Sequence, residues 1–201
     1  MRLGVFGGTF DPPHIAHLIL AMEAYEQLHL DRVLWVLTPN PPHKPDRRDI
    51  TPLAIRLEML NAAIAGNPAF AVSRADIDRP PPHYATGTMK ALRIEFPSDT
   101  LVYLIGGDSL RDLPTWHEPQ EFLAAVDELG VMRRPGARLN LAALETLLPS
   151  LHLKLRFVHA PLIEISGTVI RQRAAAGQDF RYYLLPSVYA QVVVHNLYQS
   201  T

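Results

Sequence analysis

The chain has 201 residues, 48% of them hydrophobic and 19% charged, values typical of a folded domain that buries a sizeable core. Its 19 basic and 20 acidic side chains nearly cancel, so no overall field attracts nucleic acid or an anionic membrane, and we expect neither as a partner. The absence of cysteine excludes disulfides, thiolate metal sites and a cysteine nucleophile, and is compatible with a reducing compartment. No stretch resembles a signal sequence or a membrane span, so we expect a cytoplasmic protein.

The predicted strands and helices alternate along nearly the whole chain. Continuous apolar runs predict strands over residues 3–6, 33–37, 70–73, 101–105, 129–132 and 153–158. Helical patterns lie between them at 15–22, 51–64, 88–95, 119–126, 142–148, 169–176 and 186–197. This alternation predicts a single α/β domain over residues 1–201, with a Rossmann-like, doubly wound parallel sheet, helices on both faces and a ligand beyond the carboxyl ends of the strands.

Proline is the unusual residue in the composition. The 18 prolines make up about 9% of the chain, against a usual level of about 5%. The triplet Pro-Pro-His occurs at residues 12–14, 41–43 and 81–83. Because the spacing and the flanking residues differ, the triplets are not an architectural repeat, and we expect three separate stiff loops.

The loop after the first strand carries the strongest functional signal. Asp11 is expected to cap the next helix, with the two prolines in its first turn. His14 and His17 then lie about 60° apart around the helix axis, beside an apolar stripe of Ile15, Leu18, Ile19 and Met22, and can point at one ligand.

This loop has the chemistry of a polyphosphate site. Gly7 and Gly8 let the backbone approach a ligand, and the helix start offers free N–H groups and a positive dipole end. Neither a Walker A loop nor G-x-G-x-x-G is present. A single histidine on a surface is usually only solvated, but the pair in this context favours a functional role. A metal hydrolase that uses both histidines lacks a third ligand nearby.

A second candidate anion site is the segment Ser166-Gly167-Thr168, which follows the last predicted strand and begins a helix. Hydroxyl groups, backbone N–H groups and the Arg171 fork suit an anion. The alternative is a helix cap beside a solvated arginine, which composition alone favours.

The motif G-G-T-F-D-P-P-H-x-x-H resembles the signature of the nucleotidylyltransferases, and among them the bacterial nicotinate-nucleotide adenylyltransferases. The resemblance extends from residue 3 to residue 198, with further matching segments in order at 39–45, 107–110, 114–116, 134–136 and 165–171. The chain departs from the family pattern at Ala16, which replaces a glycine, and at Gly167, which replaces a serine. It also reads His83-Tyr84-Ala85 where the family tends to read Ser-Tyr-Thr.

The resemblance implies transfer of AMP from ATP to nicotinic acid mononucleotide, with release of pyrophosphate. It implies that His14, His17 and Arg171 act on the phosphates. The residues expected to bind ATP besides these are Gly7, Gly8, Thr9, Phe10, Gly107, Asp108, Arg134, Ser166 and Thr168. Asp108 is expected to accept the ribose hydroxyls, although a role as a helix cap is compatible with this.

The acceptor mononucleotide is expected to bind at the second and third proline loops and at the loop that contains Trp116, whose indole can stack on the pyridine ring. Backbone N–H groups near Ala85 and His117 are expected to face the ring carboxylate, and Thr86 is a candidate to replace the missing threonine hydroxyl. The residues assigned to this half are Lys44, Tyr84, Ala85, Thr86, Trp116 and His117.

The attacking phosphate monoester has a second pKa of about 6, so it is already an anion and needs no general base. Mg²⁺ is expected to bind through the ATP phosphates and water, without a protein cage. Nicotinamide mononucleotide and phosphopantetheine are alternative acceptors, and a regulatory nucleotide-binding module without turnover is an alternative of another class. The sequence leaves the oligomeric state open.

Overall fold

The structure is a computed structural model that describes residues 1–42, 50–133 and 139–199. Lys44 and Arg134, which the sequence predicts as ligand-binding residues, lie outside the described residues.

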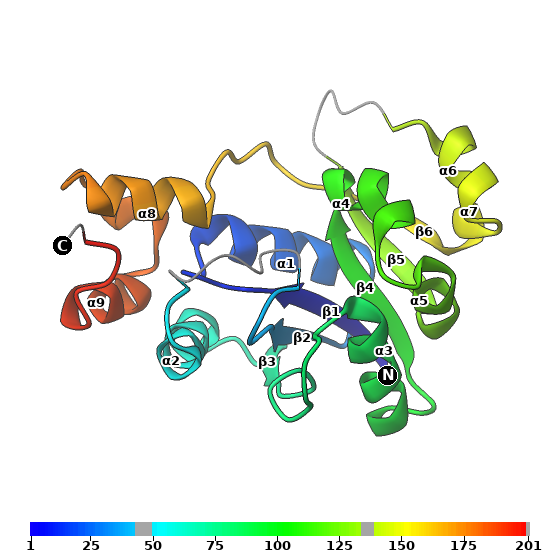
Figure 1. The fold of residues 1–201 in the computed structure, drawn as a ribbon, viewed down its shortest axis with the longest axis horizontal. Helices are drawn as coiled ribbons and strands as arrows, with labels where there is room; N and C mark the ends of the chain where they lie inside the picture. Colours follow the sequence, from blue (N-terminus) through cyan, green and yellow to red (C-terminus); the bar gives the residue numbers. More distant parts are fainter. Residues whose placement is uncertain (43–49, 134–138, 200–201) are drawn as a thin grey trace.

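A parallel six-stranded sheet of order β3-β2-β1-β4-β5-β6 forms the centre of the molecule (Figure 1). The strands are β1 (Arg2–Gly8), β2 (Arg32–Leu37), β3 (Phe70–Ser73), β4 (Thr100–Gly106), β5 (Glu128–Arg133) and β6 (Leu155–His159). The chain reverses its direction across the sheet between β1 and β4, so the loops after these strands diverge and leave a crevice. The doubly wound sheet predicted from the sequence is confirmed.

Helices cover both faces of the sheet. Their bounds are α1 (Ile15–Gln27), α2 (Leu53–Ile64), α3 (Ala85–Glu95), α4 (Gly107–Asp112), α5 (Pro119–Ala125), α6 (Leu141–Leu147), α7 (Leu151–Lys154), α8 (Gly167–Ala175) and α9 (Pro186–Val194), with short 3₁₀ turns η1 (Leu113–Thr115) and η2 (Arg181–Tyr183). Side chains of α1, α2, α8 and α9 share one core with alternate strand positions, and side chains of α3 to α7 share the other. Both layers therefore bury an apolar face on one sheet.

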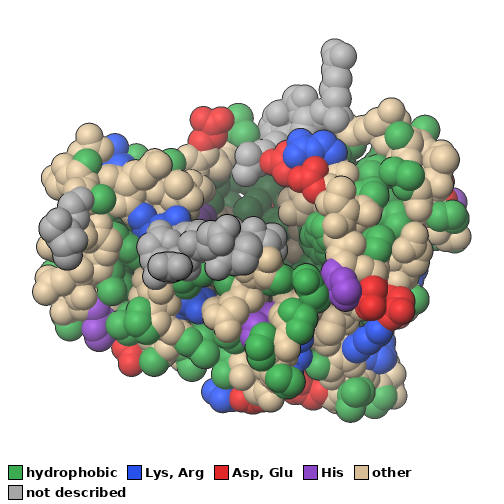
Figure 2. Space-filling model, in the orientation of Figure 1, with side chains coloured by type: hydrophobic (Ala, Val, Ile, Leu, Met, Phe, Trp, Pro, Cys, Tyr) green, Lys and Arg blue, Asp and Glu red, His purple; other side chains and the backbone are tan. Residues whose placement is uncertain are grey.

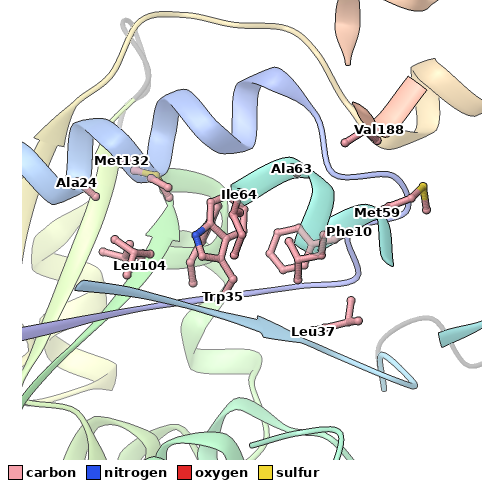
Figure 3. Packing of buried hydrophobic residues seen from close by; sticks show 14 of the residues in the cluster. Phe10, Ala24, Trp35, Leu37, Met59, Ala63, Ile64, Leu104, Met132 and Val188 are labelled. Carbon is pink, nitrogen blue, oxygen red and sulfur yellow. The ribbon is translucent and has the colours of Figure 1, made fainter. Parts of the chain in front are cut away.

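The first core is built around aromatic rings of β1 and β2. Trp35 is fully buried, with its ring centroid 5.0 Å from that of Phe6 and 5.3 Å from that of Phe10. Met59 and Ile64 of α2 and Val188 of α9 close this cluster (Figure 3). The core thereby reaches the start of the loop that carries the two histidines.

The apolar stripe predicted for the first helix is wrong. Met22 is 47% exposed, and the buried residues of α1 are Ala16, Ala21 and Ala24. Small side chains let the helix axis approach the sheet closely, so the alanines are buried and the larger residues lie at the sides. His17 shares the inward face with Ala21 and Ala24 through i, i+4, i+7 spacing, so it does not lie beside the buried stripe as predicted.

Other elements also differ from the predictions. Leu153 and Lys154, predicted as strand, belong to α7. Helix α3 begins at Ala85, three residues before the predicted start, and α4 follows β4 directly without having been predicted. At six residues, α4 is too short to display a helical period. Among the described residues, no helix has the length and apolar character needed to cross a membrane.

Candidate active site

Part of the predicted site surrounds one cavity at the carboxyl ends of β1 and β4, whereas His14, His17 and Arg171 are not among the described residues that line it. A cavity of about 680 Å³ opens there, a volume within the usual range for small-molecule sites. The predicted residues that line it are Gly7, Gly8, Thr9, Tyr84, Ala85, Trp116 and His117. In the space-filling view this face of the molecule is hollowed between α8 and α4 (Figure 2). The binding region therefore lies at the crevice that the strand order predicts.

The cap of α1 differs from the prediction. His14 is the N-cap residue, and the helix begins at Ile15, so the two prolines precede the helix. The Asp11 carboxylate does not cap the helix because it is engaged elsewhere. Its Oδ1 accepts a hydrogen bond from the Tyr198 hydroxyl at 2.7 Å, and its Oδ2 accepts one from the Thr51 N–H at 3.4 Å.

The two histidines stack on each other. Their ring centroids are 3.6 Å apart with an interplanar angle of 23°. The backbone N–H of His14 donates to Nδ1 of His17 at 3.2 Å, so a neutral His17 carries its proton on Nε2. The two side chains are therefore adjacent, and their joint action on one ligand stays a prediction.

Burial keeps both imidazoles neutral. His14 is 6% exposed, and this desolvation lowers its pKa to about 4. Burial also lowers the pKa of His17 well below its usual value, and the neighbouring His14 adds to that shift. Near neutral pH the pair therefore presents hydrogen-bond donors without a prior positive charge.

Helix α8 begins beside the same loop. Nη1 of Arg171 donates to the Asp11 carbonyl at 2.6 Å, and Nη2 donates to the Thr168 hydroxyl at 3.2 Å. A Cβ atom at Gly167 would lie only 2.9 Å from the same carbonyl oxygen, so glycine is what allows this approach. The structure thus brings the two predicted anion sites, 160 residues apart in the sequence, into contact.

The Ser166 hydroxyl is a helix cap, as the alternative interpretation of this segment predicted. It caps α8 by accepting a hydrogen bond from the Val169 N–H at 3.2 Å. A contact between Ser166 or Thr168 and ATP stays a prediction.

The glycine loop itself divides into exposed backbone and a buried side chain. Phe10 is 2% exposed, and its ring packs onto Gly8, where a Cβ would lie 2.9 Å from the ring. The ring also contacts His17 edge to face at 5.1 Å. Only the backbone of Phe10 can therefore serve ATP, while the side chain supports the loop from below.

Gly107 and Asp108 lie at the start of α4, after β4 as predicted. Gly107 is buried, whereas the Asp108 side chain is exposed and accepts a hydrogen bond from Arg111 at 3.1 Å. Gly106 is the N-cap residue, so Asp108 does not cap this helix. Neither residue lines the cavity within the described part of the chain, and the predicted ribose contact of Asp108 remains untested.

Aromatic side chains also line the cavity. The Trp116 indole is partly buried and packs against the rings of Phe122 at 5.2 Å and Tyr103 at 6.3 Å. Tyr84, the N-cap residue of α3, stacks on His117 with ring centroids 4.1 Å apart. The indole is therefore fixed in place before any ligand binds.

Thr86 is not placed for the contact predicted for it. Its side chain is buried, and its hydroxyl donates to the His117 carbonyl at 2.9 Å. Thr86 therefore ties the start of α3 to the Trp116 loop and cannot replace a threonine hydroxyl at position 85. The N–H groups of the first turn of α3 begin beside the cavity at Ala85.

Sequence reasoning missed Arg56. This arginine is 1% exposed and donates to four backbone carbonyls, those of Thr51 at 2.8 Å, Thr9 at 2.9 Å, Thr38 at 2.9 Å and Pro39 at 2.8 Å. It thereby joins the loops after β1 and β2. The sequence contains one signal for this role, because Arg56 is a charged residue three positions after Leu53 and so lies within the apolar stripe of α2.

Asp76 is a second residue that sequence reasoning missed. It is 2% exposed, lines the cavity, and accepts hydrogen bonds from the Thr88 hydroxyl at 2.7 Å and Arg79 Nε at 3.1 Å. These bonds compensate a buried carboxylate. No local pattern distinguishes Asp76 from the neighbouring exposed Asp78.

The fold and the site together define a Rossmann-like nucleotidyltransferase domain, with a glycine loop and a histidine pair at the switch point of the sheet. The chain belongs to the cytidylyltransferase-like family, whose model matches residues 5–173. Among its relatives is a probable nicotinate-nucleotide adenylyltransferase of Thermomicrobium roseum, 45% identical over 99% of this chain and 92% of that protein. A protein of the same name from Thermus thermophilus is 41% identical over 99% of this chain and its own full length.

Solved structures support the same fold. Nicotinic acid mononucleotide adenylyltransferase of Plasmodium falciparum in complex with NaAD superimposes with a TM-score of 0.80, over 98% of this chain and 97% of that one. The same enzyme in complex with APC gives a TM-score of 0.77, over 98% and 96%. At 17% sequence identity these two structures bear on the fold alone.

Proposed function

We propose that this protein transfers the adenylyl group of ATP to nicotinic acid mononucleotide and releases pyrophosphate. One observation carries the proposal. Arg171 of α8 contacts the loop that leads from β1 to His14 and His17, and the glycines at the start of that loop line one cavity together with Trp116. An anion site next to an aromatic platform suits the joining of a polyphosphate to a nucleotide with a flat ring. The names of the relatives agree with this reaction.

In the proposed reaction, an oxygen of the mononucleotide phosphate attacks the α-phosphorus of ATP. The bond from the α-phosphorus to the bridging oxygen of the β-phosphate breaks, and its electron pair leaves with pyrophosphate. The nucleophile is ionised at neutral pH, so catalysis consists of positioning and of stabilising the leaving charge.

The phosphates of ATP would lie at the two helix starts. Neutral His17 would donate its Nε2 proton in a hydrogen bond to a phosphate oxygen, because its Nδ1 is held by the His14 N–H. Arg171 would supply positive charge, from a position set by the Asp11 carbonyl and the Thr168 hydroxyl. Each donor gains strength as charge develops on the departing pyrophosphate.

The mononucleotide would bind with its pyridine ring on the Trp116 indole. Backbone N–H groups in the first turn of α3, which has 11 residues, offer a site for the ring carboxylate. An amide lacks the negative charge that this helix end attracts. We therefore propose the acid as the acceptor in preference to nicotinamide mononucleotide.

Mg²⁺ is proposed to enter with ATP, held by phosphate oxygens and water, which are ligands that it prefers. When bound, the ion would neutralise part of the polyphosphate charge. Among the described residues no group of three or more His, Cys, Asp or Glu side chains is arranged to hold a metal.

The expected cytoplasmic location of the protein also stays a prediction.

The deciding experiment measures pyrophosphate release with ATP and Mg²⁺, offering nicotinate mononucleotide, nicotinamide mononucleotide and phosphopantetheine in parallel. We expect release with the first and much slower release with the others. The His17→Ala variant should lose orders of magnitude in kcat while keeping its circular dichroism spectrum. Release with none of the acceptors would favour a binding module, and unchanged turnover in His17→Ala would remove His17 from the mechanism.

A further inference from the structure

A buried polar cluster lies beneath the phosphate loop, and the proposed mechanism does not use it. At its centre is Asp11, which is 4% exposed. Its carboxylate accepts the Tyr198 hydroxyl at 2.7 Å, a contact between residues 187 apart in the sequence. Tyr198 follows α9 in the chain and packs against the core that also contains side chains of α2 and α8.

We propose that Tyr198 is a positioning residue for ATP, which sets the phosphate loop and the Arg171 guanidinium through Asp11. The inference rests on the proposed function, because it assigns Arg171 to the phosphates. Tyr198 is not a catalytic residue in this view, since its hydroxyl contacts the loop and not the cavity.

The first step of the argument is the orientation of the carboxylate. One oxygen of Asp11 faces the Tyr198 hydroxyl, and the other faces the backbone N–H of Thr51 at 3.4 Å. Two donors from separate segments fix the plane of the carboxylate. A buried carboxylate needs such donors, because it is costly to desolvate.

The second step connects Asp11 to the anion site. The backbone carbonyl of Asp11 accepts a hydrogen bond from Nη1 of Arg171 at 2.6 Å. Asp11 therefore contacts Tyr198 through its side chain and aligns the Arg171 guanidinium through its backbone. Three residues later the chain reaches the N-cap residue His14. A small rotation of Asp11 therefore moves both phosphate-binding elements.

The third step concerns the state of the phenol. Burial raises the pKa of Tyr198, and the adjacent Asp11 carboxylate raises it further, while Thr51 and Arg171 oppose the shift. The hydroxyl thus keeps its proton and remains a donor across the pH range of an assay. Without it, Asp11 loses its shortest described side-chain bond and its carboxylate can turn toward Arg171, in competition with the phosphates of ATP.

The test compares Tyr198→Phe with Tyr189→Phe in the full chain. Tyr189 is a partly buried tyrosine of α9 whose ring packs on Phe180 at 5.4 Å, so its variant also loses one hydroxyl from the same layer. We expect Tyr198→Phe to lower kcat/KM for ATP about tenfold, with little change in KM for the mononucleotide. Tyr189→Phe should leave both values within about twofold.

A direct binding measurement makes the result independent of turnover. Titration calorimetry with a non-hydrolysable ATP analogue should show weaker binding to Tyr198→Phe by about the same factor, even if the acceptor has been assigned wrongly. In an Asp11→Ala background the Tyr198→Phe change should have little further effect, because the side chain that the hydroxyl orients is gone. A purely structural role would instead lower the urea midpoint and affect both substrates equally, and that result, or unchanged ATP binding, would overturn the proposal.

Discussion

Replacing Arg56 by methionine tests whether one buried guanidinium holds the two sides of the site together. The four carbonyl groups that it binds come from the loops after β1 and β2 and from Thr51. Methionine keeps much of the aliphatic volume but leaves these buried acceptors without their donor. The loss therefore isolates the hydrogen bonds from the packing.

The expected magnitude follows from burial. A hydrogen bond to a charged group contributes about 1.5–3 kcal/mol, but the full value for four bonds is an upper limit, because loops relax and water enters. Leaving a buried acceptor without its donor costs about 1–3 kcal/mol, and because loops relax and water replaces part of the lost bonds, we expect a total loss of about 3–5 kcal/mol. Burial lowers the pKa of Arg56, and the nearby Asp11 carboxylate opposes this shift. The guanidinium therefore stays charged at neutral pH.

Urea denaturation followed by circular dichroism measures the loss. Arg111→Met is the matched control, since the Arg111 side chain is 62% exposed and pairs with Asp108 and Asp112 at the surface. This variant should keep nearly the same urea midpoint as the unchanged protein. Arg56→Lys should recover only part of the stability, because an ammonium lacks the planar fork. In Arg56→Met the KM values for both substrates should rise, since Thr9 and Thr38 both line the cavity. A loss below about 1 kcal/mol with unchanged KM values would refute this account.

Three further predictions concern separate parts of the site. Gly167→Ala should destabilise the protein and raise KM for ATP, because the added Cβ would lie 2.9 Å from the Asp11 carbonyl oxygen, although replacing glycine by alanine in a helix is usually stabilising. Urea denaturation measures the loss, with Gly107→Ala as the control, since a Cβ there would lie 3.9 Å from its nearest atom. A stabilised Gly167→Ala variant would contradict this prediction. Trp116→Ala should raise KM for the mononucleotide about tenfold with little change for ATP, since ring stacking is worth about 1 kcal/mol or more; steady-state kinetics decide, and an effect confined to ATP would disprove the stacking role. The pKa of His14 falls to about 4 on folding, so as the pH is lowered the unfolded state takes up a proton before the folded state does. The free energy of unfolding should therefore drop by about 2 kcal/mol between pH 7.5 and pH 5. The urea midpoint should fall less steeply with pH in His14→Gln, and an equal pH dependence in both proteins would exclude His14 as the cause.

Local sequence patterns were sufficient to predict the six strands, all helices except the short α4 and α7, and the loop at which the site begins. Continuous apolar runs mark strands that are covered on both faces, and all six predicted strands are present, with only residues 153 and 154 misplaced. Glycine, proline and histidine after the first run indicated the loop at the carboxyl end of β1. These signals are readable because they depend on neighbours within one or two turns of the chain.

Other features depended on packing between distant segments. The stripe of large apolar residues at helical spacing did not identify the buried face of α1, because close approach to the sheet selects small side chains such as Ala21 and Ala24. The helix cap was wrong for a related reason, since the Asp11 carboxylate is held by Tyr198 and Thr51. A side chain with a distant partner cannot fulfil the role that its local context suggests.

The sequence by itself determined which groups are present at the site, namely two histidines, an arginine, a glycine loop and an indole. Tertiary structure decided how they act. It stacked the imidazoles and lowered their pKa by burial, placed Arg171 against the Asp11 carbonyl, and joined the loops through Arg56. Desolvation and contacts between residues 47 to 187 positions apart exist only once the two layers have closed on the sheet.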